Sequence, residues 1–412
     1  MLRVLVLDDE SMVVDLLAVC LRAPGVHLTT CLEIEAAEAL LRCFRFDVVV
    51  TDLSVSGLGG LEGMRLIRFI TTHFPDITVY VLSGFVDDRV RALCAALGVT
   101  AVLEKPGGLS ELRDLLLERR EALAPAESGG GEARTAVPPG EVQKVELLEE
   151  FLATSTIASV LQPLVRLRQG AEPFEVFGVE GLARGPSASV LGSPAVLLAY
   201  AAHKELLFKV DMICIQAALA EVRHLGIPVA TFLNVQPRSM TNPVFAAKLS
   251  EAVRGAGLAE KDIVLELTEQ QTILNPRAFA TTLQKLRERG FRIALDDFGE
   301  GSSNLNLFQD LRPDFLKISG TFCRNLARDP FKQIVVQSTA EMAARAGTAT
   351  VMEAVETAED AEVLRHLGID YGQGHYFSEP LPGRELAGRL HGGQAYPRPG
   401  GADLSRTAAP PS

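Results

Sequence analysis

The sequence lacks an excess of basic residues, because 40 Lys and Arg stand against 52 Asp and Glu and the formal net charge is -12. Duplex DNA is usually bound by a basic protein face, so DNA binding is not expected. Long apolar runs are also missing: none approaches about 18 uninterrupted residues, and acidic residues begin at Asp8. We therefore expect neither a membrane span nor a secretory signal.

Cysteine is scarce as well. The six cysteines show no C-x-x-C spacing and mostly lie in apolar segments, which is typical of reduced core thiols and indicates a cytoplasmic protein. No self-similar period of about 20 to 50 residues is visible, so a solenoid is not expected. What is present is 47% hydrophobic residues over 412 positions, enough for two or three domains with cores of their own.

Residues 1–120 alternate short apolar runs with helical periodicity. The runs include RVLVLDD, FDVVVTDL and TVYVLSG. Continuous apolar strands separated by helices predict a parallel sheet covered on both faces. The expected fold is a doubly wound five-stranded α/β domain, which binds its ligands beyond the carboxyl ends of the strands.

The composition changes twice further along the chain. Gly, Pro and charged residues replace the periodic pattern in residues 121–145, which predicts a linker, and in residues 391–412, which predicts a disordered tail. Between them, residues 146–390 alternate strand-like and helical patterns again, and most strand-like runs end in polar or acidic residues. Acidic groups at the carboxyl ends of strands are typical of a (β/α)8 barrel, so a TIM-like barrel is expected here.

Five polar residues follow the predicted strands of the first domain: Asp8, Asp9, Asp52, Ser83 and Lys105. Carboxylates gathered at one sheet edge repel one another unless a hard cation such as Mg2+ lies among them. This set resembles the receiver domains of response regulators over nearly all of residues 1–120. The resemblance implies that a histidine kinase phosphorylates Asp52. Asp8 and Asp9 would help to hold one Mg2+, and Ser83 and Lys105 would contact the phosphate.

The receiver resemblance has a gap at Val102, where the family usually carries the aromatic residue that reads out phosphorylation. We therefore expect the signal to leave the receiver by another route. No helix-turn-helix module follows, so direct transcription control is not expected. No GGDEF-like segment is present, so synthesis of cyclic di-GMP is not expected either.

The predicted strands of the second domain end in five carboxylates, one asparagine, one glutamine and one lysine: Glu180, Asn234, Glu266, Asp296, Asp297, Lys317, Glu353 and Gln373. Such an oxygen-rich set suits Mg2+ or Mn2+. Because it contains no His or Cys, a zinc site is disfavoured.

The motifs around these residues resemble the EAL domain family of cyclic di-GMP phosphodiesterases. They are QP at 162–163, EGLAR at 180–184, LNV around Asn234, ELTE at 266–269, LDDFG at 295–299, LKIS at 316–319, MEAVET at 352–357 and QG at 373–374. The resemblance implies hydrolysis of cyclic di-GMP to linear pGpG with two metal ions, Mg2+ or Mn2+.

The resemblance also implies a role for each residue. The first metal would be held by Glu180, Asn234, Glu266 and Asp296, and the second by Asp296, Asp297 and Glu353. Catalysis would rest on the second set together with Lys317, which would orient the attacking water. Gln162, Arg184 and Gln373 would bind the substrate. Glu356 would brace the loop after the aspartate pair.

Several positions depart from the EAL pattern without removing a metal ligand. Glu300 replaces a Thr, Ser302 replaces an aromatic residue, Ser319 replaces an Asp and Ala354 replaces a Gly. Three functions therefore stay open: an active phosphodiesterase, a receptor that binds cyclic di-GMP without hydrolysing it, and a protein-interaction module. The family also implies a homodimer through the barrel.

Overall fold

The computed structural model describes residues 1–55, 62–84, 86–123, 142–167, 175–187, 189–268, 275–300 and 304–391. Most of the predicted linker (124–141), nearly all of the predicted tail (392–412), Glu269 and Ser302 lie outside this range. The chain divides into two compact units, Met1–Thr156 with Gly185–Leu206, and Ile157–Arg184 with Leu207–Ser412.

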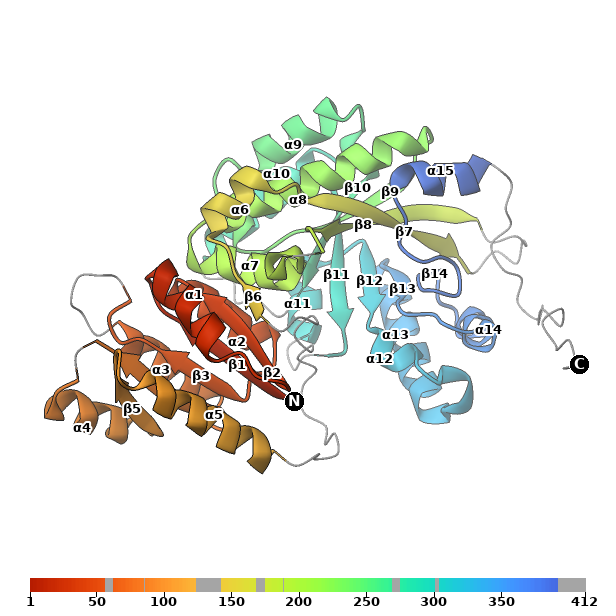
Figure 1. Cartoon of the computed structure of the whole chain (residues 1–412). Coiled ribbons are helices and arrows are strands. Elements are labelled where there is room, and N and C mark those ends of the chain that lie inside the picture. The colour runs from red at the N-terminus through yellow and green to blue at the C-terminus, as the bar shows by residue number, and fades with distance from the viewer. Residues whose placement is uncertain are drawn as a thin grey trace, which may run out of the picture. The chain divides into compact units, whose positions relative to one another are not determined.

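The first unit is built on a six-stranded sheet with the order β5-β4-β3-β1-β2-β6 (Figure 1). Its strands are β1 (Leu2–Leu7), β2 (Val26–Cys31), β3 (Val48–Thr51), β4 (Thr78–Ser83), β5 (Ala101–Glu104) and β6 (Val142–Lys144). All neighbouring strands are parallel, which confirms the predicted doubly wound fold. The sequence predicts five strands. The sixth, β6, lies in the predicted linker and pairs with β2.

Helices accompany this sheet: α1 (Ser11–Cys20), α2 (Ile34–Cys43), α3 (Gly63–His73), α4 (Asp88–Ala96), α5 (Leu109–Ala122), α6 (Leu148–Thr154), the 3-10 turn η1 (Val190–Gly192) and α7 (Pro194–His203). The central strand β1 is buried along four successive residues, from Val4 to Leu7, as expected for a strand covered on both faces. The order of the strands reverses between β1 and β3, so the carboxyl ends of these two strands flank the crevice where doubly wound folds bind ligands.

The second unit is a closed barrel with the order β10-β11-β12-β13-β14-β7-β8-β9. Its strands are β7 (Ala158–Arg166), β8 (Val176–Arg184), β9 (Ala230–Asn234), β10 (Ile263–Thr268), β11 (Arg292–Phe298), β12 (Phe315–Ile318), β13 (Ala349–Met352) and β14 (Tyr371–Gly372). The predicted TIM-like barrel is confirmed, with one difference: β7 is antiparallel to both neighbours. Only residues 167–175 join β7 to β8, too few for the helical crossover that a parallel pair needs.

The helices of the second unit are α8 (Leu207–Val222), α9 (Phe245–Gly255), α10 (Pro276–Glu288), α11 (Asn304–Leu311), α12 (Gly320–Cys323), α13 (Pro330–Ala346), α14 (Ala358–His366) and α15 (Gly383–His391). Short 3-10 turns are η2 (Arg223–Leu225), η3 (Ser239–Thr241), η4 (Glu260–Asp262) and η5 (Leu326–Arg328). Apolar side chains of α8, α9 and α10 pack against β9, β10 and β11 in one large buried cluster. This outer layer holds the strands in place.

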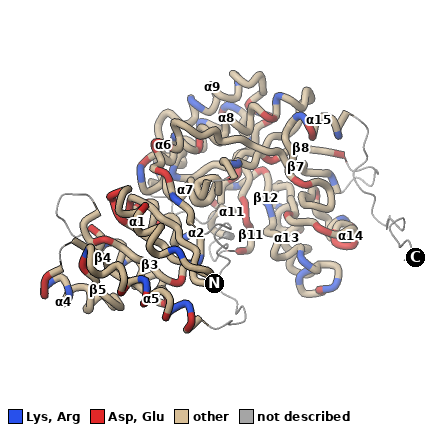
Figure 2. The backbone as a smooth tube through the Cα atoms, in the orientation of Figure 1, with Lys and Arg blue, Asp and Glu red and all other residues tan. Residues whose placement is uncertain are grey.

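Lys and Arg are interspersed with Asp and Glu along the described part of the chain, among a majority of uncharged residues (Figure 2). None of the described helices combines the length and apolar character needed to cross a membrane. All six cysteines are free, and Cys31, Cys94 and Cys323 are buried.

Candidate active site

An apolar layer fills the barrel below the carboxyl ends of its strands. It includes Phe232, Val264, Ala294, Phe315 and Val351. Two residues after each of these stands a predicted site residue, respectively Asn234, Glu266, Asp296, Lys317 and Glu353. Because side chains two positions apart on a strand share a face, these polar groups form the next layer at the barrel mouth.

Lys317 is the centre of this polar layer. Its side chain is 1% exposed, and its Nζ lies 2.8 Å from Glu266 Oε1, 2.8 Å from Glu353 Oε1, 3.1 Å from Asp296 Oδ1 and 3.3 Å from Glu180 Oε2. Burial alone would lower the pKa of Lys317, but the surrounding carboxylates raise it well above its ordinary value. The lysine is therefore positively charged in this arrangement, which suits it to hold carboxylates or water rather than to act as a general base.

Amide side chains hold Glu180 in place. Asn234 Nδ2 donates to Glu180 Oε1 at 2.7 Å, and Gln373 Nε2 donates to Oε2 at 2.8 Å. Gln373 Nε2 also lies 3.1 Å from Gln162 Oε1. Burial raises the pKa of Glu180, but Lys317 and the two amides outweigh burial and leave it below its ordinary value. Glu180 is thus ionised and fixed in orientation.

Two consecutive aspartates face the site because β11 is irregular where they lie. In a regular strand, Asp296 and Asp297 would point to opposite faces. The register between β11 and β12 shifts between Leu295 and Phe298, and Asp297 adopts a left-handed backbone with a φ of 55°. Carboxylate oxygens of Asp296, Asp297 and Glu353 consequently lie within 4.8 Å of one another.

The carboxylates at the mouth outnumber the single lysine. Among the described residues, neither oxygen of Glu266 nor Asp296 Oδ1 has a hydrogen-bond partner, although Lys317 lies within ion-pair distance of both residues. Burial and the neighbouring charges raise the pKa of Glu266 well above its ordinary value, that of Glu353 to about 8 and that of Asp297 to about 6. Buried carboxylates that outnumber the positive charge around them fit a divalent cation.

A cavity of about 310 Å3 opens beside Glu180. Gln162 and Gln373 line it, together with Glu356 and His375. Glu356 is exposed, and because residues 301–303 lie outside the described range, its predicted bracing role stays a prediction. A larger cavity of about 670 Å3 between α8 and α9 contains none of the predicted site residues.

Arg184, the last residue of β8, is exposed, and its Nη1 donates to the carbonyl of Ala183 at 2.8 Å. Within the described ranges the structure does not join this arginine to the Lys317 cluster. A long exposed side chain at the end of β8 is free to turn toward a bound anion, so its predicted role stays a prediction.

A second polar cluster lies at the edge of the sheet in the first unit. Lys105 Nζ is 2.6 Å from Asp52 Oδ2 and 2.5 Å from Asp8 Oδ2, and Ser83 Oγ donates to Asp52 Oδ1 at 2.6 Å. Carboxylate oxygens of Asp8, Asp9 and Asp52 lie within 4.8 Å of one another. Burial raises the pKa of Asp8, and burial would lower that of Lys105, but its two carboxylate partners raise it. All five predicted residues are thus brought together, and the three carboxylates fit one hard cation.

Sequence reasoning missed two residues near the barrel mouth. Asp211 of α8 is 2% exposed and accepts a hydrogen bond from the backbone N–H of Gln236 at 3.0 Å, two residues after Asn234. Burial raises the pKa of Asp211 to about 7. The sequence signal that could have indicated Asp211 is an acidic residue inside the mostly apolar run LFKVDMICIQ. His375, which lines the cavity, offered none beyond its place after QG.

Comparison with known proteins follows the two units. A family model for the EAL domain matches residues 145–380, and one for the response regulator receiver domain matches residues 4–117. The cyclic di-GMP phosphodiesterase RocR of Pseudomonas aeruginosa is 28% identical over 397 residues, which cover 92% of this chain and 96% of RocR. The cyclic di-GMP phosphodiesterase PdeF of Escherichia coli is 32% identical over 194 residues, 46% of this chain and 26% of PdeF.

Solved structures resemble the barrel. The EAL enzyme Bd1971, in a form bound to cAMP and cyclic di-GMP, aligns with a TM-score of 0.52 and 26% identity over 58% of this chain and 65% of its own. BlrP1 of Klebsiella pneumoniae, in a manganese and cyclic di-GMP complex at pH 6, aligns with a TM-score of 0.50 and 28% identity. This alignment covers 55% of this chain and 56% of the BlrP1 chain. The alignments therefore span under two thirds of each solved chain.

Proposed function

The chain belongs to the EAL domain family and carries an N-terminal receiver domain, and on that premise we propose that it hydrolyses cyclic di-GMP to linear pGpG under control of the receiver. The observation that carries the proposal is the polar layer at the barrel mouth, where Lys317 lies within 3.3 Å of four carboxylates from four different strands or strand ends. A barrel that needed acids only for solubility would not bury them around a lysine.

We propose two divalent cations, Mg2+ or Mn2+, and the oxygens of Asp296, Asp297 and Glu353, which lie within 4.8 Å of one another, fit one of them. One would be held by Glu180, Asn234, Glu266 and Asp296, and the other by Asp296, Asp297 and Glu353. When bound, such cations lower the pKa of water and neutralise charge on a phosphodiester. The excess of buried carboxylates over the single Lys317 supports this proposal, because buried negative charge is costly unless enough positive charge compensates for it.

Lys317 orients the attacking water in this mechanism. Its ammonium group donates hydrogen bonds and accepts none, which suits it to orient a water oxygen. The same positive charge offsets the repulsion among the carboxylates and holds their side chains in position. The apolar layer of Phe232 and Phe315 below excludes water from the barrel interior, so that the reaction is confined to the mouth.

The cavity beside Glu180 would receive part of the substrate. Gln162 and Gln373 lie in its wall and offer amide donors and acceptors to a guanine edge. Arg184 would turn from the Ala183 carbonyl to a substrate phosphate, since a guanidinium binds phosphate in a bidentate manner. Gln373 Oε1 is buried without a hydrogen-bond partner among the described residues, which leaves it available as an acceptor.

In the receiver, Asp52 would accept a phosphoryl group from a histidine kinase, with one Mg2+ held by Asp8 and Asp9. Ser83 and Lys105 already contact the Asp52 carboxylate and would contact the phosphate. A homodimer through the barrel is a further proposal from the family, which light scattering of the purified protein tests.

A chromatographic turnover assay tests the proposed function. Purified full-length protein with Mn2+ should convert cyclic di-GMP to pGpG. Glu180→Ala should abolish product, since it removes a buried carboxylate that Lys317, Asn234 and Gln373 all contact. The matched control is Glu251→Ala, which removes an exposed glutamate of α9 and should leave turnover unchanged.

The same assay separates the alternatives when calorimetry is added. A receptor would bind cyclic di-GMP and release no pGpG, and an interaction module would do neither. Either result with the wild-type protein would overturn the proposed hydrolysis.

A further inference from the structure

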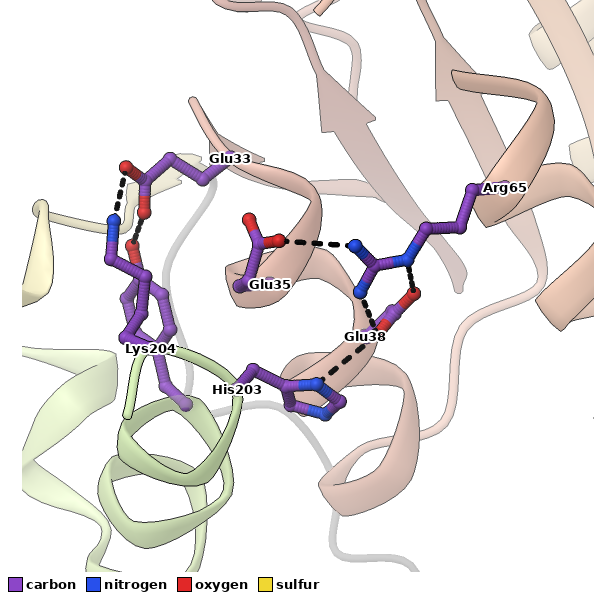
Figure 3. Close-up of polar contacts among 7 residues, drawn as sticks. Glu33, Glu35, Glu38, Arg65, His203 and Lys204 are labelled. Carbon is purple, nitrogen blue, oxygen red and sulfur yellow. Dashed lines mark hydrogen bonds and ion pairs between the residues drawn. The ribbon is translucent and has the colours of Figure 1, made fainter. Parts of the chain in front are cut away.

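The first unit joins the receiver to residues 185–206, which belong in sequence to the EAL domain (Figure 3). The contact is made between α2 of the receiver and α7. Glu33, just before α2, accepts a hydrogen bond from the hydroxyl of Tyr200 and another from Lys204 Nζ at 2.9 Å. Tyr200 is 1% exposed, so this polar contact lies at the buried part of the interface.

Helix α2 is buried on nearly all sides. Ala36, Ala37, Ala39, Leu40 and Leu41 are each at most 2% exposed. A surface helix of a doubly wound domain buries only the stripe that faces its sheet. The small side chains of α2 instead allow a second helix, α7, to pack closely on its outer face, where Val196, Leu197 and Ala201 are buried.

A second polar contact connects α7 to another receiver helix. His203 Nδ1 lies 3.3 Å from Glu38 Oε2, and Glu38 is 4% exposed. Arg65 of α3 holds the same carboxylate with two bonds, from Nε at 3.1 Å and from Nη2 at 3.0 Å, and reaches Glu35 at 3.3 Å (Figure 3). Glu38 is therefore shared between α3 and α7.

Helix α3 begins against the phosphorylation site. The backbone N–H of Gly63 donates to the carbonyl of Leu53 at 2.9 Å, and a Cβ at Gly63 would lie 2.2 Å from the carbonyl oxygen of Asp52. The Asp52 side chain in turn accepts from the N–H groups of Leu53 and Ser54. A backbone shift at Asp52 must therefore displace the start of α3, and Arg65 lies two residues further along.

A displacement of α7 would act on elements that carry groups at the barrel mouth, because α7 lies between two such elements in the chain. It follows β8, which carries Glu180 and Arg184, and it precedes α8, which carries Asp211. Both flanking elements position groups at the barrel mouth, because Asp211 holds the backbone after Asn234.

From these contacts we infer that the face of the receiver formed by Glu33, Glu35 and Glu38 docks α7 of the EAL domain, and that Arg65 couples this docking to phosphorylation of Asp52. The inference builds on the proposed function, because the regulated activity is the proposed hydrolysis. This coupling would carry the phosphorylation signal out of the receiver without the aromatic residue that the family usually has at the position of Val102. The coupling uses the Glu38 carboxylate, which Arg65 of α3 and His203 of α7 both contact.

Hydrogen–deuterium exchange of the full-length protein tests the coupling without relying on turnover. Beryllofluoride with Mg2+, which mimics a phosphorylated aspartate, should change the exchange rate of α7 amides by about fivefold or more, the range of ordinary allosteric coupling. Arg65→Ala should remove that change. Arg68→Ala, an exposed arginine on the same helix, is the matched control and should respond as wild type.

A charge exchange tests the docking itself. Lys204→Glu places a carboxylate against Glu33 and should speed exchange of α7. The double variant Glu33→Lys with Lys204→Glu should restore part of the slow exchange, because Glu149, 3.4 Å from Lys204 Nζ in the wild type, would still repel the new glutamate. The inference is overturned if beryllofluoride leaves α7 unchanged in the wild type, if Arg65→Ala responds fully, or if Lys204→Glu exchanges as wild type.

Turnover measured in the same samples separates this inference from the proposed function. The ratio of rates with and without beryllofluoride should depart from one in the wild type and return to one in Arg65→Ala, with basal turnover unchanged. A protein whose α7 responds but which makes no pGpG would refute hydrolysis alone. A protein that makes pGpG with an unresponsive α7 would refute the coupling alone.

Discussion

Ser319 donates a hydrogen bond from its Oγ to Oε1 of Glu300 at 2.5 Å. Both residues depart from the EAL family pattern, which has Asp in place of the serine and Thr in place of the glutamate. The family pair is thus one hydroxyl and one carboxylate, and this chain has the same two groups with their positions exchanged. The contact ties the loop after the aspartate pair to the end of β12, next to Lys317.

This exchange predicts that the two departures compensate for each other. Ser319→Ala should lower turnover by about 10- to 100-fold, because a misplacement of roughly 1 Å near reacting groups has costs of this order. The double variant Glu300→Thr with Ser319→Asp, which recreates the family pair, should stay within about threefold of wild type. Steady-state kinetics measure both, and a Ser319→Ala enzyme of wild-type rate would contradict the prediction.

Ala354 stands where the family has Gly, and its φ of 50° lies in the left-handed region that a Cβ disfavours. Ala354→Gly should raise the free energy of unfolding by about 0.5–1 kcal/mol, after allowance for the greater freedom of glycine in the unfolded chain. Urea denaturation of the purified variant measures this change. An unchanged or lower stability would show that the backbone is unstrained there.

Gly320 offers a related test, since a Cβ at this position would lie 2.5 Å from the Cβ of Ala354. Gly320→Ala should cost about 2 kcal/mol or more in the wild-type background, as overpacking does. The cost should fall below about 1 kcal/mol when Ala354→Gly is also present. A double-mutant cycle by urea denaturation reports this coupling, and additive effects would exclude the contact.

Glu266 is 0% exposed, and its Oε1 lies 2.8 Å from Lys317 Nζ. Glu266→Gln removes one of the carboxylates that repel one another around Lys317 but also removes its ion pair with that lysine, so the stability of the metal-free protein should change by less than about 1 kcal/mol. The same variant should lose the rise in melting temperature that Mn2+ gives the wild type. Thermal unfolding with EDTA or Mn2+ measures both effects, and Glu251→Gln is the exposed control.

The raised pKa of Asp211, about 7, predicts a pH-dependent stability. Its folded pKa exceeds the unfolded value near 4, so its protonated form stabilises the fold at low pH and that contribution is lost as the pH rises toward 7. Relative to Asp211→Asn, the wild type should lose about 2–3 kcal/mol between pH 5 and pH 7.5. Denaturant titrations in EDTA check this difference, and a constant offset would mean that Asp211 is ionised throughout.

The site could be predicted from the sequence to the extent that it depends on strand order. Acids at strand ends meet at one edge of a sheet or barrel, so the strand pattern alone groups Asp52 with Lys105 and Glu266 with Lys317. The bulge at Asp297 could not be predicted, because no residue type signals a register shift. The role of Lys317 as the common partner of four carboxylates also depends on distances that spacing does not supply.

Contacts between distant segments could not be predicted from the sequence. The strand β6 has three residues in a stretch of linker composition, so no periodicity indicates that it extends the receiver sheet beside β2. In the sequence, Glu300 and Ser319 are two separate departures from the family, since their partnership appears only when the loop and β12 are side by side. The packing of α7 on α2 is hidden for the same reason.

The packing of α7 on α2 determines which truncated fragments of this protein can fold correctly. A fragment that begins at the start of the EAL match, residue 145, keeps α7 but removes α2, the helix on which it packs. Tyr200 would lose its carboxylate partner, and the part of α7 that packs on α2 would meet solvent. Such a truncated barrel should aggregate, and properties measured on it would describe a damaged domain rather than an unregulated one.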